Sequence, residues 1–491
     1  MTAWSQCAGC PATELLRTLE DRVGPVPVLA SDAGRLRAGG NSMANKGGAA
    51  RPLDVPVAYA AVILAGRAAK VTWVLLETGV RVGAAWVSTR PKSRRELFAS
   101  KLVGIALRQI HQLGATFIKF AQLLSTRVDV LPPELCAELS QLHDDVAAIR
   151  PATARRLAGK RLGGAGLDAL FATFDAVAVA SGSIACVYQA TLHDGTVVAV
   201  KLRRPGVDKV LGADLTLMRG VARIMAKLPA FRSLPVREMI DQLGGAIVAQ
   251  LDLGKEAWAL GALAENLSEL NGIVVPAART DLTGPEQTKA GILIMEFIPD
   301  LVRRNPAEFA EEARKLVIAR SLDSVYKMLF LDGLVHNDLH PGNLYFLPDG
   351  RIVMVDAGFV TQLSEKARKD FLAFFYAMAL GDEARCSAIL IDTGTIPDDF
   401  DRAGFDHEVG ALVRASSGAR TKDFNLLEFA STLFDIQRRY RLYADPEFVF
   451  PILSLLVLEG AIKEFAPDTD FQSHALPYVL RALPDLQADA A

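Results

Sequence analysis

The chain has 491 residues, of which 51% are hydrophobic, and a formal net charge of −2. This length exceeds the size that one hydrophobic core usually serves, so we expect at least two domains or lobes. The nearly neutral charge gives no electrostatic basis for a nucleic-acid partner. Five scattered cysteines do not form a disulfide framework, which favours a reducing compartment.

Residues 1–50 are rich in glycine and alanine and lack hydrophobic periodicity, so we predict a disordered tail. The start of the chain contains Glu14, Arg17 and Glu20 and lacks the apolar segment of a secretory signal. The uncharged apolar stretches are shorter than the ~18–20 residues that cross a bilayer. We therefore expect a cytoplasmic protein, and peripheral binding to the inner face of the membrane stays open.

A helical extension is predicted over residues 51–165. Its first helix, residues 55–88, is apolar and carries two tryptophans, and its charged side chains recur at helical spacing in one stripe: Arg67, Lys70, Glu77 and Arg81. Residues 51–110 hold ten Lys or Arg against three Asp or Glu. A basic helix with tryptophans can lie in a membrane interface, and it can equally pack on the rest of the protein. Both interpretations stay open.

A small β-rich lobe is predicted over residues 166–300. Val- and Ala-rich runs at 174–203 indicate strands joined by a turn at Asp194-Gly195. Residues 205–270 predict two helices, and GILIMEFI at 291–298 predicts a buried strand.

A larger helical lobe is predicted over residues 301–491, interrupted by a loop and strand region at 334–360. A β-rich lobe followed by a helical lobe is typical of an α+β, protein-kinase-like bilobal fold, here with an N-terminal helical extension.

The stretch HNDLHPGN at 336–343 indicates a site for phosphoryl transfer. Asp338 lies five residues before Asn343, and Asp356 follows a predicted strand in VMVDAG. In kinase-type sites one carboxylate orients the acceptor, while an amide oxygen and a second carboxylate hold the Mg²⁺ at the nucleotide phosphates. We therefore predict Asp338 as catalytic and Asn343 and Asp356 as metal ligands. For His336 we expect a structural role in bracing the loop.

Lys201 closes the apolar strand VVAVK, where a kinase lysine binds phosphates and is held by a glutamate from a helix. Glu256 in QLDLGKEAW is the candidate glutamate, and Asp252 precedes it by four residues, on the same face of the predicted helix. Like charges repel at that spacing, which is easier to explain if Lys201 or Mg²⁺ lies between them. A solvated acidic face is the alternative.

The nucleotide loop has an unusual sequence. No G-x-G-x-x-G motif precedes Lys201, and the segment ASGSIA at 180–185 takes its place. Small side chains there let the backbone approach phosphates. We predict these nucleotide-binding residues: Ser181, Gly182 and Ser183 in the loop, with Glu296 and Ile298 at the end of GILIMEFI.

Together these residues resemble the UbiB/ADCK family of atypical kinases, over residues 100–470. Four blocks carry the resemblance: GATFIKFAQLLSTRVDVLPPEL at 114–135, ASGSIACVYQA with VAVKLRRPGV at 180–207, QLDLGKEA at 250–257, and HNDLHPGNLYF with VDAG at 336–358. The resemblance implies that Lys201 and Glu256 form the family's ion pair. It also implies that Asp338 is the catalytic-loop aspartate and that Asn343 and Asp356 hold the metal. The loop at Ser181–Ser183 corresponds to the family's alanine-rich loop.

The resemblance further implies a gating extension that folds over the active site. Lys119 and Gln122 match the family's KxGQ motif, and Asp252 matches the aspartate of its ExD motif, so we assign a gating role to these three residues. The sequence departs from the family in that KxGQ is KFAQ and ExD begins with Gln250.

The function that the resemblance implies is an ATPase-like activity with ATP and Mg²⁺ as cofactors, linked to ubiquinone or related isoprenoid-lipid metabolism. The implied partners are an isoprenoid lipid or quinone, quinone-biosynthesis enzymes and a membrane surface. Two alternatives stay open. One is a nucleotide-gated scaffold with little turnover, which Gln250 and the occluding extension favour. The other is a soluble small-molecule kinase of the aminoglycoside or choline kinase type, against which the block at 114–135 counts.

Overall fold

The computed structural model describes residues 57–88, 95–125, 127, 131, 133–140, 142, 147–163, 166–227, 236–299, 301, 305–339, 343–417, 425–469 and 471–488. The tail predicted over residues 1–50 lies outside them. The chain divides into two compact units, named here the sheet unit (Leu53–Glu308 and His336–Val360) and the helical unit (Phe309–Val335 and Thr361–Ala491). Residues 336–360, which the sequence placed in the helical lobe, belong by their contacts to the sheet unit, and the lobe boundaries stay a prediction.

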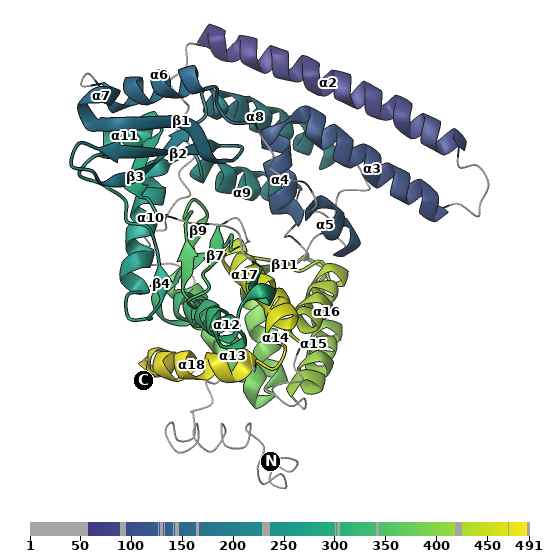
Figure 1. Cartoon of the computed structure of the whole chain (residues 1–491). Helices are drawn as coiled ribbons and strands as arrows, with labels where there is room; N and C mark the ends of the chain where they lie inside the picture. The colour runs from purple at the N-terminus through teal and green to yellow at the C-terminus, as the bar shows by residue number, and fades with distance from the viewer. Residues whose placement is uncertain are drawn as a thin grey trace, which may run out of the picture. The chain divides into compact units, whose positions relative to one another are not determined.

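The sheet unit opens with the helices of the N-terminal extension (Figure 1). They are α2 (Val57–Ser88), α3 (Arg95–Leu113), α4 (Ala115–Ser125), α5 (Pro133–Ser140), α6 (Pro151–Leu162) and the short α7 (Leu167–Leu170). Helix α2 packs on α3 and on the later helix α8 (Val207–Met225), and α4 packs on α5 and on α9 (Val236–Ala249). The predicted helix over residues 55–88 is confirmed.

The sheet unit contains a four-stranded antiparallel sheet in the order β1-β2-β3-β5. Its strands are β1 (Phe171–Ser181), β2 (Ala185–Leu192), β3 (Val197–Arg203) and β5 (Ile292–Glu296). Strand side chains alternate between faces. Val198, Val200 and Leu202 of β3 are therefore buried together in one hydrophobic core, and Lys201 lies on the opposite face.

The helices beside this sheet correct one expectation. Residues 205–270 form three helices and not two: α8 (Val207–Met225), α9 (Val236–Ala249) and α10 (Leu253–Asn266). The chain breaks before α10 because Asp252 has an extended backbone, and its carboxylate accepts hydrogen bonds from the amides of Gly254, at 3.0 Å, and Lys255, at 3.3 Å. An aspartate that satisfies the first amides of a helix is its N-cap. The expected shared helical face of Asp252 and Glu256 is therefore wrong.

The rest of the sheet unit is a small sheet in the order β4-β8-β7, with β4 and β8 parallel and β7 and β8 antiparallel. Its elements are β4 (Ile273–Val274), α11 (Pro285–Ala290), the 3₁₀ turn Pro306–Glu308, β7 (Leu344–Phe346) and β8 (Ile352–Met354). Strand β8 is buried along its whole length, so it anchors the segment that leads into Asp356.

The helices of the helical unit pack around a core that contains aromatic side chains. Its elements are α12 (Glu311–Tyr326), a π-helical turn (Lys327–Asp332), α13 (Glu365–Leu380), α14 (Glu383–Asp392), β10 (Gly394–Thr395), α15 (Arg402–Ser417), α16 (Leu426–Arg439), β11 (Tyr443–Ala444), α17 (Pro446–Phe465) and α18 (Phe471–Ala488), while β6 (Leu334–His336) and β9 (Val360–Gln362) lie at the boundaries of the units. Phe371 of α13 stacks on Phe448 of α17 with ring centroids 4.0 Å apart.

The fold is α+β, as predicted. In the part of the chain that the structure describes, every helix is too short or too polar to span a bilayer.

Candidate active site

One buried lysine bonds to two carboxylates from distant parts of the sheet unit. Nζ of Lys201 lies 2.5 Å from Oε1 of Glu256 and 2.7 Å from Oδ2 of Asp356. Lys201 comes from the middle of the sheet, Glu256 from the first turn of α10, and Asp356 from the segment after β8. The structure thus brings together three of the residues predicted from the sequence.

Burial and the charges within this cluster shift the pKa values of its three side chains. The side chain of Glu256 is 1% exposed, and burial raises its pKa to about 7 although the Lys201 ammonium acts in the opposite direction. Asp356 is only partly buried; this partial burial alone would raise its pKa, but the charge and hydrogen bond of Lys201, with the Gly358 amide, hold it below its ordinary value. Burial lowers the pKa of Lys201, and the two carboxylates outweigh this, so its pKa is raised. The lysine therefore stays charged in the site.

The predicted catalytic residue, Asp338, is held by its own loop. Nδ2 of Asn343 donates to the backbone oxygen of Asp338 at 3.0 Å and to its Oδ2 at 3.2 Å. Both bonds use the amide nitrogen of Asn343, and neither uses the amide oxygen, the atom that would face a metal. Nζ of Lys119, from α4, lies 3.9 Å from Oδ2 of Asp338. The helical extension thus places a positive charge beside the predicted catalytic carboxylate.

His336 links the loop that carries Asp338 to the segment that carries Asp356 through hydrogen bonds of its imidazole ring. Its Nδ1 accepts from the Asp338 amide at 3.1 Å, and its Nε2 bonds to the backbone oxygen of Asp356. A backbone N–H can only donate and a carbonyl oxygen can only accept, so the pattern requires a neutral imidazole with its proton on Nε2. The expected bracing role of His336 is confirmed.

The loop at 182–184 joins β1 to β2 next to the lysine strand. Ala185 pairs with Arg203 and Val187 pairs with Lys201, so the loop lies just beyond the lysine along the sheet. Arg204, a residue that no sequence pattern singled out, holds this loop: its Nε donates to the Gly182 oxygen at 2.7 Å and its Nη2 to Oγ of Ser181 at 2.8 Å. Ser183 is buried. The only sequence signal for Arg204 was its place in the RRPGV block.

A second residue that was not assigned to the site is Gln250. A Cβ built on Gly358 would lie 3.0 Å from Oδ1 of Asp356, 3.9 Å from Oε2 of Glu256 and 4.0 Å from Cγ of Gln250, so the three side chains converge there. Nε2 of Gln250 is buried and has no hydrogen-bond partner within the described part of the chain. A buried donor without a partner is costly, and here it lies beside the acidic cluster.

The remaining predicted residues lie outside this cluster. The carboxylate of Glu296 accepts from the Ala277 amide at 3.4 Å. Glu296 also pairs with Val198, so its side chain is on the sheet face opposite Lys201. Ile298 follows β5 and is half-buried. Nε2 of Gln122 donates to the Leu142 oxygen at 2.9 Å. The assignments of these residues stay predictions.

Asn343 and Asp356, the predicted Mg²⁺ ligands, carry side-chain oxygen atoms of the kind that Mg²⁺ binds. Across the described ranges, no three His, Cys, Asp or Glu side chains form a metal-binding group. A kinase-type Mg²⁺ site needs no such group, since an amide oxygen, a carboxylate and substrate phosphates complete it. Asn343 and Asp356 would supply oxygen ligands of that kind, and the side chain of Asp356 is 36% exposed, so an ion from solvent can reach it; their role as metal ligands stays a prediction.

Comparisons with known proteins found similarities to a family model, a curated relative and a solved structure. Residues 141–390, half of the chain, match the ABC1 atypical kinase-like domain. The "Probable protein kinase UbiB" of Pseudomonas putida is 29% identical over 420 residues, which are 84% of this chain and 76% of that protein. Among solved structures, a chain described as the complex of Rv3197 with erythromycin from Mycobacterium tuberculosis is 20% identical with a TM-score of 0.49, covering 72% of this chain and 89% of that one.

Proposed function

The chain belongs to the ABC1, or UbiB/ADCK, family of atypical kinases, and on this premise we propose that it is a Mg²⁺-dependent ATPase or kinase that supports ubiquinone or related isoprenoid-lipid metabolism at a membrane surface. The observation that carries the proposal is the contact of Lys201 with both Glu256 and Asp356. His336 links the same loops to Asp338. This is the residue set that phosphoryl transfer requires.

Each residue has a chemical task in this proposal. Lys201 binds the nucleotide phosphates, and Glu256 positions its ammonium. Asp338 orients the acceptor, which is water or a small molecule. Asn343 and Asp356 hold Mg²⁺, which neutralises phosphate charge when bound. Fixed positive charge at the phosphates is the largest catalytic contribution in this class of reaction.

Helix α2 supports the membrane part of the proposal. Arg67 turns inward: its Nε and Nη2 donate to the two carboxylate oxygens of the fully buried Asp214 in α8, at 2.6 and 2.8 Å. Large apolar side chains are exposed to solvent instead: Val62, Trp73, Leu75, Leu76, Val80 and Trp86. Trp73 is 68% exposed and Val80 74%. A helix that exposes apolar and aromatic residues along its length fits a lipid interface.

The activity is tested by phosphate release from Mg-ATP by the full chain, with and without anionic liposomes. We expect turnover that rises with liposomes and is abolished in Asp338→Asn and Asp356→Asn. Asp349→Asn, an exposed turn residue bonded to Arg351, is the matched control and should keep full activity. Full activity in Asp356→Asn would refute the metal assignment.

The membrane surface is tested by flotation with anionic liposomes. Trp73→Glu should abolish flotation because it places a charge on the apolar face of α2. Trp258→Glu on α10 is the matched control, since that tryptophan is also exposed. Equal flotation of the two variants would mean that α2 is not the membrane-binding element.

A second candidate function is a nucleotide-gated scaffold with little turnover. The observation that favours it is Lys119, whose ammonium lies beside Asp338 and competes for the carboxylate that would orient an acceptor. Tight ATP binding without phosphate release in the wild type, and release in Lys119→Gln, would support the scaffold. Turnover in the wild type equal to that of Lys119→Gln would reject it.

A further inference from the structure

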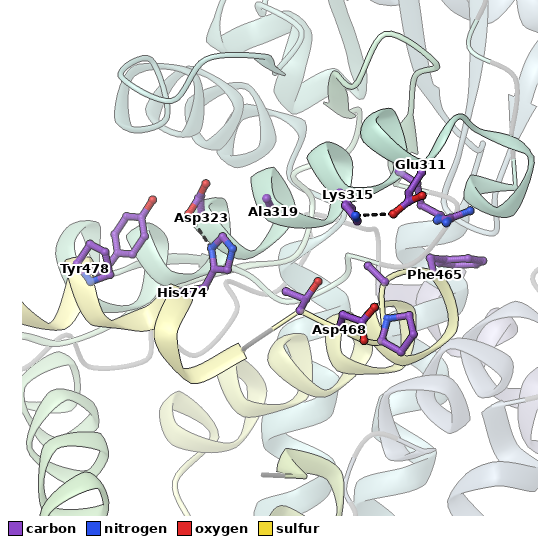
Figure 2. Close-up of a pocket in the computed structure, with 13 residues that line it drawn as sticks. Glu311, Lys315, Ala319, Asp323, Phe465, Asp468, His474 and Tyr478 are labelled. Carbon is purple, nitrogen blue, oxygen red and sulfur yellow. Dashed lines mark hydrogen bonds and ion pairs between the residues drawn. The ribbon is translucent and has the colours of Figure 1, made fainter. Parts of the chain in front are cut away.

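A pocket in the helical unit lies outside the nucleotide-binding residues. Its volume is about 850 Å³, within the range of small-molecule sites. One wall is a single face of α12, where Glu311, Lys315, Ala319 and Asp323 follow one another at four-residue spacing. The opposite wall comes from the end of α17, the linker after it and the first turns of α18, as Figure 2 shows. We name it the α12 pocket.

Most charges in the α12 pocket are already paired. Nζ of Lys315 lies 2.5 Å from Oε1 of Glu311. Nδ1 of His474, from α18, lies 3.6 Å from Oδ1 of Asp323. The two pairs lie on either side of Ala319 in Figure 2. A ligand that bound either pair would have to displace an existing partner.

Arg314 belongs to neither pair, although its charge helps to lower the pKa of the neighbouring Glu311. It lines the pocket and is half-buried, and its Nε is shielded from solvent with no hydrogen-bond partner among the residues that the structure describes. Among the described residues, its guanidinium makes no ion pair or side-chain hydrogen bond. A shielded N–H donor without a partner is costly, and an acceptor that binds it removes that cost. Guanidinium matches a carboxylate in shape, because two parallel N–H groups can donate to its two oxygens.

The other pocket walls narrow the choice of anion. Ala319, Phe465 and Pro477 offer apolar surface, and the ring of Tyr478 is buried against α12, 6.2 Å from Tyr326. The acidic side chains in the pocket, including the exposed Asp468, disfavour a doubly charged ligand such as a phosphate monoester. We propose that the α12 pocket binds an organic monocarboxylate, with its carboxylate on Arg314 and its apolar body against Phe465 and Pro477.

The proposal is tested with a panel of carboxylates on the full chain: octanoate, 3-phenylpropionate and benzoate. Saturation-transfer NMR detects binding, and calorimetry gives the affinity. We expect at least one carboxylate to bind with a stoichiometry of one, and octylamine and octyl phosphate to bind more weakly than octanoate. Arg314→Gln should weaken binding about ten- to hundred-fold, as expected for the loss of a charge-assisted hydrogen bond. The affinity of Arg314→Lys for the carboxylate should lie between those of the wild type and Arg314→Gln, because lysine keeps the positive charge but lacks the two parallel N–H groups of a guanidinium.

Lys315→Gln is the matched control, since Lys315 is a neighbouring cation of the same pocket that is already paired. It should leave the affinity within about threefold of the wild type. Three results would overturn the proposal: no carboxylate binds, binding is unchanged in Arg314→Gln, or octylamine or octyl phosphate binds more tightly than octanoate. The outcome is independent of phosphate release, so failure here leaves the proposed kinase or ATPase activity untouched.

Discussion

The buried carboxylate of Glu256 makes the stability of the protein depend on pH in a defined direction. Its pKa in the folded protein is raised from 4.5 to about 7. Between these values the folded state binds the proton of Glu256 more tightly than the unfolded chain does. Stability from this group is therefore present at low pH and is lost as the pH rises towards 7 and above. Glu256→Gln removes the titrating proton and keeps an acceptor for Lys201.

The size of the effect follows from the pKa difference. One pKa unit corresponds to about 1.36 kcal/mol. Between pH 5 and pH 8 the wild type should thus lose roughly 2–3 kcal/mol of unfolding free energy relative to Glu256→Gln. The variant itself should be less stable than the wild type at pH 5, with the gap closing or reversing at pH 8.

Urea unfolding at pH 5 and pH 8, followed by circular dichroism, measures this difference. Glu265→Gln is the matched control, because it makes the same chemical change at an exposed position of the same helix. The same difference between wild type and Glu256→Gln at both pH values would refute the reasoning, because it would mean that Glu256 titrates as an ordinary glutamate.

Three further substitutions test other contacts. Arg204→Lys should weaken ATP binding about tenfold in calorimetry, because lysine cannot bond the Gly182 oxygen and another loop atom with one planar group. An unchanged affinity for ATP would mean that this loop does not take part in nucleotide binding. Gln250→Glu adds a third carboxylate beside Lys201 and should lower the free energy of unfolding at pH 8 by roughly 1–3 kcal/mol, and Mg²⁺ should restore part of that loss. If Mg²⁺ restored none of it, residue 250 would not lie close enough to Glu256 and Asp356 to share a cation with them. Asp214→Asn should cost about 3–5 kcal/mol in urea unfolding, because it leaves Arg67 without its anion; a loss below 1 kcal/mol would mean that the pair does not hold α2.

The sequence predicted the members of the Lys201 cluster but not all of their neighbours. Lys201, Glu256 and Asp356 each lie in a short motif whose residue types are set by phosphate chemistry, so each could be identified locally. The contact of Arg204 with the loop depends on how β1, β2 and β3 pair, and no local pattern encodes it. Gln250 was noted as a departure from the family, yet its place beside Gly358 depends on the same long-range packing.

The break before α10 is a different kind of miss, because its signal was in the sequence. Asp252 is followed by Leu253, Gly254 and Lys255, and aspartate is among the strongest N-cap residues. The four-residue spacing to Glu256 suggested a shared helical face, and the capping chemistry prevailed over it. The N-cap also fixes where α10 begins, which places Glu256 in its first turn, opposite Lys201.

The orientation of α2 could not be chosen from its own sequence, because a helix with a charged stripe and an apolar remainder can bury either side. The choice is made by Asp214, which lies 147 residues away from Arg67 and is fully buried in α8. Rotating α2 to bury Trp73 would withdraw Arg67 and leave that carboxylate unpaired, at a cost of about 3–5 kcal/mol. One internal ion pair thus keeps the apolar face of α2 on the outside. An exposed apolar face maintained in this way has a physical reason if the surface that meets it is lipid.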